Sequence, residues 1–165
     1  MRGKQEAGSL TKKLIKILCP EIIFYYCTHC AIQLNKDCEM SKKQLFTLEY
    51  PVRCSPSILY EFLSTPAGLQ EWFADKVDER DSVFSFSWNG NVEMAEVMEG
   101  EEEKFVRFHW LTAPKEEYFE FRIEKSEVTN QTILVINDFA DKKEIKDQSQ
   151  LWNYQVKDLF HRIGS

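Results

Sequence analysis

The sequence predicts an α+β domain in which an antiparallel sheet of six or seven strands wraps around one long C-terminal helix. Strand-like alternation of apolar and polar residues recurs between residues 45 and 139, and turn-forming residues separate the alternating segments. A one-sided apolar helix follows them. A helix of this kind needs a concave surface to cover its apolar side, and a curved sheet supplies that surface.

The first expected elements are one strand and two short helices. Alternation over residues 45–52 predicts the strand, because its even-numbered apolar residues fall on one side. Each helix begins with a hydroxyl N-cap followed by proline at the first helical position, at Ser55-Pro56 and at Thr65-Pro66. These two starts predict a compact helical pair between the first strand and the rest of the sheet.

From residue 76 onward the apolar period changes to two, which predicts an antiparallel meander. Phe84, Phe86 and Trp88 alternate along one strand, and Asn89-Gly90 after them predicts a tight hairpin. The return strand is expected over residues 91–99. The remaining strands are expected over residues 105–111, 118–125 and 132–139.

The last expected element is an amphipathic helix over residues 144–163. Apolar residues recur along it at three- and four-residue spacing, with Trp152 among them. Gly164 follows at the position where a C-cap glycine is typical. The sequence therefore predicts that this helix is the element around which the sheet wraps.

Residues 1–39 differ from the rest of the chain and are expected to lie outside the domain. They hold six Lys/Arg and four Asp/Glu, so they carry a net charge of +2 and the remainder carries −8. Four of the five cysteines also fall in this segment. We expect the domain to cover residues 40–165, the true start to be Met40, and residues 1–39 to be disordered or not translated.

Two other interpretations of residues 1–39 are a zinc site and a targeting segment. Cys27 and Cys30 have the spacing of a zinc knuckle, but no second paired motif follows. Lys12 and Lys13 precede an apolar-leaning run, as in a signal peptide, but charged residues and a proline interrupt it. No run approaches the roughly 20 apolar residues of a transmembrane helix. We expect no metal and no membrane span.

The composition also argues against a nucleic-acid-binding function. The net charge of −6 and the pI near 5.2 argue against a surface that binds nucleic acid, which requires clustered Lys and Arg. Without residues 1–39 a single cysteine remains, Cys54, which excludes an intramolecular disulfide and fits a reducing compartment. We expect a cytoplasmic protein with no nucleic-acid partner.

Most of the expected core residues fall in four segments, 55–63, 84–88, 105–110 and 151–164, and Pro66, Leu69, Trp72 and Phe73 lie between the first two. Through these segments the chain resembles the START-like, or SRPBCC, superfamily with its helix-grip fold, over residues 41–165. The most similar branch is related to the activator of the ninety-kilodalton heat-shock chaperone's ATPase. The superfamily includes lipid carriers, hormone receptors, polyketide cyclases and chaperone activators, so the resemblance implies a pocket and leaves the chemistry open.

No catalytic or cofactor motif is present, so the expected site is apolar. We expect aromatic residues of the strands and the C-terminal helix to line a ligand cavity, with Met94 and Met98 as adaptable fillers. The candidate ligand-binding residues are Phe86, Trp88, Phe108, Trp110, Phe119, Phe121 and Trp152. Ordinary core packing is the alternative role for the same side chains, and sequence does not separate the two.

The favoured hypothesis is a non-enzymatic protein that binds a small hydrophobic ligand between the sheet and the C-terminal helix, without a cofactor. One alternative is a chaperone-interacting module, as the resemblance implies. Another is a cyclase- or hydrolase-like enzyme that uses His109 at the pocket. Glu93, Glu96 and Glu99 are interpreted as a solvated face. A closed cavity of several hundred Å³ would favour the ligand binder, and a filled core beside an exposed apolar patch the interaction module.

Overall fold

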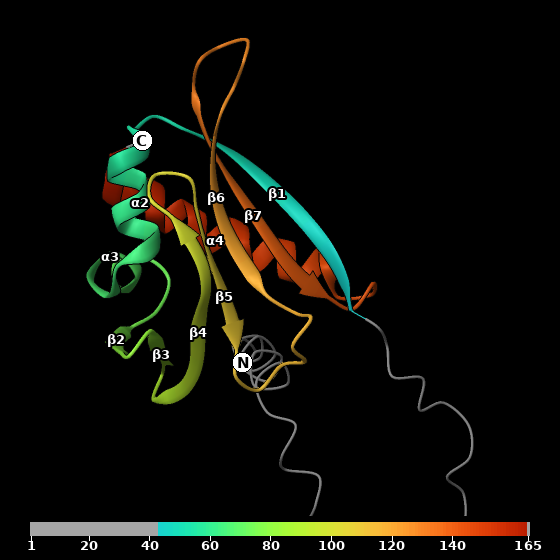
Figure 1. Ribbon diagram of the computed structural model, residues 1–165. Coiled ribbons are helices and arrows are strands. Elements are labelled where there is room, and N and C mark those ends of the chain that lie inside the picture. The colour runs from blue at the N-terminus through green and yellow to red at the C-terminus, as the bar shows by residue number, and fades with distance from the viewer. Residues whose placement is uncertain (1–42, 165) are drawn as a thin grey trace, which may run out of the picture. The chain divides into compact units, whose positions relative to one another are not determined.

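The structure is a computed structural model that describes residues 43–164 (Figure 1). The predicted element boundaries agree with it to within two residues, and β2 is the one strand that had no predicted bounds of its own. The elements in chain order are β1 (Gln44–Val52), α2 (Pro56–Ser64), α3 (Pro66–Gln70), β2 (Lys76–Arg80), β3 (Val83–Trp88), β4 (Asn91–Glu101), β5 (Phe105–Trp110), β6 (Phe119–Lys125), β7 (Thr132–Ala140) and α4 (Ile145–Ile163).

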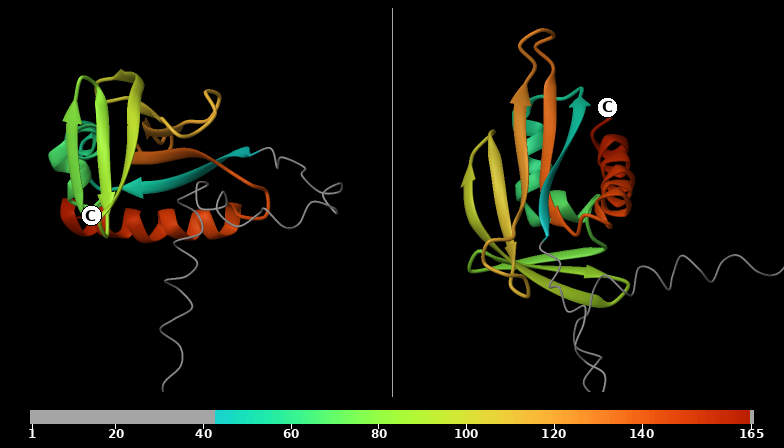
Figure 2. Two further views of the ribbon diagram at one scale, coloured as in Figure 1. Left: turned by 90° about the horizontal axis from the view of Figure 1, so that it is seen from below. Right: turned by 90° about the vertical axis from the view of Figure 1, so that its right-hand side faces the viewer.

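The seven strands form one antiparallel sheet in the order β1-β7-β6-β5-β4-β3-β2. Strands β2 to β7 form a meander, and the first strand, β1, pairs with the last strand, β7, at one edge of the sheet. Figure 2 shows α4 running along one side of the curved sheet, with α2 and α3 between the sheet and the end of α4. The predicted α+β helix-grip class is confirmed, with seven strands.

The predicted local signals produce the turns and helix ends. The Ser55 hydroxyl accepts a hydrogen bond from the Ile58 amide at 3.3 Å, and Thr65 caps α3 in the same way. The hairpin between β3 and β4 has left-handed backbone at Asn89 (φ 51°) and Gly90 (φ 84°). Each of these elements therefore begins or ends where its own residues favour it.

Gly68 has a role that the sequence analysis missed. A Cβ atom at this position would overlap the backbone of Glu61 and Phe62, so α3 approaches α2 more closely than any other residue would permit. Gly68 itself is buried and donates its amide to the Thr65 hydroxyl at 3.0 Å. The tight corner between the helices sets the direction in which the chain continues into residues 71–75.

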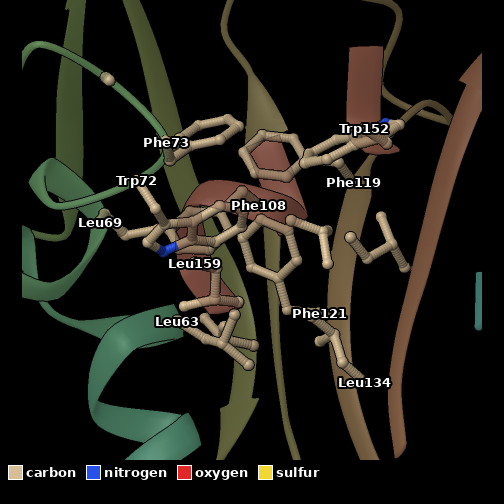
Figure 3. Packing of buried hydrophobic residues seen from close by; sticks show 14 of the residues in the cluster. Leu63, Leu69, Trp72, Phe73, Phe108, Phe119, Phe121, Leu134, Trp152 and Leu159 are labelled. Atoms are coloured by element: carbon tan, nitrogen blue, oxygen red, sulfur yellow. The ribbon is translucent and has the colours of Figure 1, made fainter. Parts of the chain in front are cut away.

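The core lies between the sheet and the helices (Figure 3). Alternate residues of β3, β5 and β6 face this side, which we call the inner face of the sheet. Aromatic side chains dominate one part of the core, and leucines such as Leu63 and Leu159 from α2 and α4 fill the part beside it. The inner face therefore carries most of the large apolar side chains.

The predictions for residues 1–39, including the zinc interpretation of Cys27 and Cys30 and the Met40 start, concern a segment outside the described residues. Within residues 43–164, no helix is long and apolar enough to cross a membrane. In the same part of the chain, no three His, Cys, Asp or Glu side chains gather as metal ligands would.

Candidate functional site

The seven aromatic residues proposed from the sequence lie together on the inner side of the molecule. With Trp72 and Phe73, which follow α3, they form what we call the aromatic cluster. Phe73 is its hub, because six rings lie around it, including Trp72 at a centroid distance of 5.6 Å. The centroid distances from Phe73 are 5.1 Å to Phe86, 5.5 Å to Trp88, 5.9 Å to Phe119, 6.0 Å to Phe121 and 5.7 Å to Trp152.

The centre of the aromatic cluster is closely packed. Phe86, Phe108, Phe119 and Phe121 are fully buried, and Trp152 is 4% exposed. Their rings stack or meet edge to face, with centroids 5.0 Å apart for Phe108 and Phe119 and 5.8 Å apart for Phe121 and Trp152. These five side chains contact one another as core residues do, and their ligand-binding role remains a prediction.

Trp88 and Trp110 form the edge of the cluster that reaches solvent. Both are only half-buried, and their ring centroids are 6.2 Å apart. Trp110 also stacks on Phe119 at 4.7 Å, and the Trp88 indole donates to the Phe73 carbonyl at 2.7 Å. The cluster is therefore continuous from its buried centre to these two tryptophans.

An open groove of about 700 Å³ is lined by Phe73, which is buried, and by Trp88, which is half-buried. One wall is the segment 70–75 after α3, and the other is the C-terminal half of α4. Trp72, Phe73, Ala74 and Trp88 supply the apolar part of its lining, and polar atoms make up most of the surface that the groove exposes. The lining residues are Gln70, Glu71, Trp72, Phe73, Ala74, Asp75, Trp88, Gln155, Asp158, His161 and Arg162.

Two tethers hold α4 to the segment that carries Phe73. Arg162 donates from Nε to the Glu71 carbonyl at 3.2 Å and forms an ion pair with the Glu71 carboxylate at 3.4 Å. Gln155 donates its amide to the Phe73 carbonyl at 3.4 Å. The groove therefore has defined walls. The sequence analysis did not name Phe73 as a site residue, although the adjacent aromatic residues Trp72 and Phe73 could have indicated it.

A buried carboxylate positions Trp152. Asp138 lies on the inner face of β7, and its Oδ2 accepts hydrogen bonds from the Trp152 indole at 2.9 Å and the Gln148 amide at 3.3 Å. Its Oδ1 accepts from the Phe139 amide at 2.7 Å. Burial raises the pKa of Asp138, and these hydrogen bonds oppose the rise only in part.

His109 does not face the aromatic cluster, which corrects the placement on which the enzymatic alternative rested. Phe108 and Trp110 point inward, so the residue between them points to the outer face of the sheet. His109 is 6% exposed there, and its Nδ1 lies 2.8 Å from the Glu117 carbonyl. Because a carbonyl can only accept, Nδ1 carries the proton, and the ring secures the loop after β5.

Strand β4 corrects two further expectations. Met94 and Met98 are about half exposed. The residues of β4 on the inner face are the alternate ones, Glu93, Ala95 and Val97. The methionines are therefore not cavity fillers. Glu93 is half-buried on the inner face, and burial raises its pKa, so it does not belong to a solvated face with Glu96.

The outer face carries a polar network around Glu120, which is buried. Arg107 approaches it at 2.6 Å, Arg122 at 3.1 Å and the Asn137 amide at 2.9 Å. Burial alone would raise the pKa of Glu120, but the hydrogen bonds from Asn137, Arg107 and Arg122 outweigh it and lower the pKa. The Arg107 guanidinium also lies 4.5 Å from the Tyr118 ring centroid. All partners of Glu120 are internal, which is typical of a structural role.

Comparison with solved structures finds a relative above 30% identity. BfR322 from Bacteroides fragilis, solved by NMR in solution, is 36% identical over 74% of this chain and 92% of its own, with a TM-score of 0.55. The Aha1 dimer from Colwellia psychrerythraea is 20% identical over 73% of this chain and 92% of its own, with a TM-score of 0.56. DynU16, a protein of the dynemicin biosynthetic locus, is 15% identical over 73% of this chain and 47% of its own, with a TM-score of 0.62.

The two less identical structures show the fold alone. No curated protein matches the sequence. The family model of the START-like superfamily domain matches residues 40–165, which include every described strand and helix. With this match and with BfR322 at 36% identity, the chain belongs to the START-like superfamily.

Proposed function

We propose that the domain binds a small hydrophobic ligand, without converting it chemically, at the aromatic cluster between the sheet and α4. One observation carries the proposal: the cluster is continuous from its buried centre to the floor of an open groove, at Phe73 and Trp88. Proteins with this fold bind hydrophobic ligands or act as cyclases. Phe73 and Trp88 offer apolar contact, and the polar residues of the lining offer orientation.

Phe73 stands between the groove and the deeper rings. Its ring lies 9° from the plane of the Trp152 ring and perpendicular to Phe86, so it occupies the position that a ligand entering from the groove would meet first. A ligand that reaches Phe119 or Phe121 displaces this ring. A ligand that stays in the groove packs against Phe73 and Trp88 while both remain in place.

The test uses N-phenyl-1-naphthylamine, a neutral apolar dye that becomes fluorescent in apolar surroundings. We expect saturable binding to the full chain. Gln155→Trp places a bulky side chain in the groove without removing a core residue and should weaken binding at least about tenfold. Tyr154→Trp is the matched control, because Tyr154 is 67% exposed and does not line the groove.

The proposal fails if the dye does not bind the wild-type chain, or if the two tryptophan variants bind it equally while keeping the wild-type melting temperature. Native mass spectrometry of protein from its own host is the second measurement. A co-purifying apolar molecule that is lost in Gln155→Trp would support the groove as its site.

A second candidate function is the chaperone-interacting module. Two observations favour it, namely the closely packed centre of the aromatic cluster and an apolar patch on the outer face, formed by Val92 (59% exposed), Met94 (50%) and Leu111 (48%). This is the combination expected of an interaction module. The Leu111 amide donates to the Met94 carbonyl at 2.9 Å, so these two residues are neighbours. If the ninety-kilodalton heat-shock chaperone binds here, Met94→Lys should abolish its capture in a pull-down and Gln155→Trp should not.

The cytoplasm is the compartment we propose. Among residues 43–164 the single cysteine, Cys54, is a free thiol, and burial raises its pKa, which makes it a weak nucleophile. We do not propose an enzyme, because His109 faces away from the aromatic cluster and is engaged with the Glu117 carbonyl.

A further inference from the structure

Glu93 is a carboxylate on the otherwise aromatic inner face. It lies directly opposite Phe86 in the ladder between β3 and β4. The residue pair Trp88 and Asn91 is the next inner-face pair toward the hairpin, and Ala95 pairs with Trp110 on the other side. Glu93 is therefore the diagonal neighbour of both tryptophans, a position from which long side chains reach one another. The small Ala95 leaves room for the Trp110 ring, which lies 5.5 Å from Phe86.

The Glu93 carboxylate has no partner of its own. Among residues 43–164, it takes part in no hydrogen bond or ion pair, although it is half-buried. Burial raises the pKa of Glu93, and no donor opposes the rise. The contrast with Asp138 and Glu120 is clear, because each of those carboxylates accepts at least three hydrogen bonds. A partly desolvated carboxylate without a donor is suited to a cation that arrives with the ligand.

We infer that Glu93, Trp88 and Trp110 recognise the positively charged, ammonium-type end of the ligand. A tryptophan face attracts a cation more strongly than any other side-chain ring does, and here two half-buried tryptophans lie with ring centroids 6.2 Å apart and planes tilted by 57°. The carboxylate supplies the opposite charge. The inference rests on the proposed function and deepens it, because it names the ligand as a cationic amphiphile whose apolar part packs on the aromatic cluster.

The charges of the groove agree with this ligand class. Trp88 belongs to both places, so the groove and the Glu93 site adjoin. The rim of the groove carries three carboxylates, Glu71, Asp75 and Asp158, one guanidinium, Arg162, and one imidazole, His161. Arg162 is paired with Glu71, which leaves the two aspartates as the net charge of the rim. The local potential therefore favours a cation and opposes an anion.

The test compares three small probes of similar size, benzyltrimethylammonium, benzyl alcohol and benzenesulfonate, followed by NMR of the tryptophan indole N–H signals. We expect the ammonium probe to bind more tightly than the alcohol, to shift the Trp88 and Trp110 signals, and to leave Trp152 unchanged. Benzenesulfonate should not bind. Glu93→Gln should weaken the ammonium probe about tenfold and leave the alcohol unaffected.

Glu96→Gln is the matched control, since Glu96 lies on the same strand with its side chain on the outer face. It should bind the ammonium probe as the wild type does. Equal loss in both variants, or no preference for the ammonium probe over the alcohol, overturns the inference. If the neutral dye still binds in that case, the proposed function stands without it. If the dye fails and the ammonium probe binds in a Glu93-dependent way, the cation site stands and the hydrophobic-ligand proposal fails.

Discussion

At the scale of single residues, two buried carboxylates illustrate how environment decides charge. Asp138 faces the apolar core, where loss of water outweighs three hydrogen bonds and raises its pKa. Glu120 faces the outer side, where two guanidiniums and an amide outweigh burial and lower its pKa. Both are acidic residues of neighbouring strands, and only their faces differ. Their contributions to stability must therefore depend on pH in opposite directions.

For Asp138, the folded protein holds the proton more tightly than the unfolded chain, whose pKa is about 3.9. The Asp138 contribution to the free energy of unfolding is therefore fully present below that value, and it declines as pH rises through the raised folded pKa. Asp138→Asn removes this titration. Denaturant unfolding between pH 3 and 8 should show the free energy of wild type minus variant falling as pH rises. A difference that stays constant with pH would contradict the assignment.

For Glu120, the contribution to the free energy of unfolding changes with pH in the opposite direction. Its stabilising contribution is present above the unfolded pKa of about 4.3 and is lost as pH falls through the lowered folded value. Glu120→Gln should lower the free energy of unfolding at pH 7 by roughly 1 to 3 kcal/mol, because the charged hydrogen bonds from Arg107 and Arg122 are weakened. Glu124→Gln, at an exposed position on the same strand, should change it little. Equal effects at pH 7 would remove Glu120 from the network.

At the scale of elements, glycines act for different reasons in two places. Gly90 has φ 84° in the β3–β4 hairpin, and a Cβ there would meet nothing within 4 Å, so only backbone strain opposes another residue. Gly68 has no such dihedral constraint, but a Cβ there would overlap the backbone of α2. The role of Gly90 can be predicted from the sequence, because Asn-Gly is a typical hairpin turn signal. The role of Gly68 cannot, because it depends on the close approach of α2 to α3.

Gly68→Ala should therefore separate α2 from α3 and lower the free energy of unfolding by roughly 1 to 3 kcal/mol through overpacking. Gly90→Ala should cost about 1 kcal/mol through backbone strain alone. Chemical denaturation of both variants checks the values. The packing change should also shift the amide NMR signals of Glu61 and Phe62. Unchanged signals at those residues would argue against the close approach.

Helix α4 depends on Trp152 for its contact with the sheet. The ring stacks on Phe73, meets Phe121 edge to face and donates to Asp138. Trp152→Ala should cost roughly 3 to 5 kcal/mol, since it removes a buried aromatic side chain. Trp152→Phe should cost less, because it keeps a ring in place and loses the indole hydrogen bond. A loss below about 1 kcal/mol in the alanine variant would place Trp152 outside the core.

At the scale of the whole molecule, the expected boundary at Met40 leads to a prediction about residues 1–39. A chain that begins at Met40 should have the same thermal midpoint as the full chain, because the family model and all described elements lie within residues 40–165. Differential scanning calorimetry of the two chains checks it. A drop of many degrees on truncation, or stoichiometric zinc in the full chain, would show that residues 1–39 contribute to the fold.

The sequence by itself determined the type and order of the elements. Strand alternation, the Ser55-Pro56 and Thr65-Pro66 starts and the Asn89-Gly90 turn are local signals, and the structure confirms them within two residues. The strand residues of the aromatic cluster could also be named, because large apolar side chains at period two seek the buried face of a sheet. His109 could have been assigned to the outer face by the same alternation, since Phe108 and Trp110 flank it.

Only the tertiary structure decided how these residues meet. Phe73 becomes the hub because the corner at Gly68 directs residues 71–75 onto the sheet. The Asp138 carboxylate accepts a hydrogen bond from Trp152, which lies on the helix that follows β7 in the chain. Glu93 becomes the diagonal neighbour of both Trp88 and Trp110 through the register of β3, β4 and β5. Such contacts join segments whose spacing in the sequence carries no information about their distance in space. Periodicity reports which side of its own element a residue occupies, and packing between elements decides what that side faces.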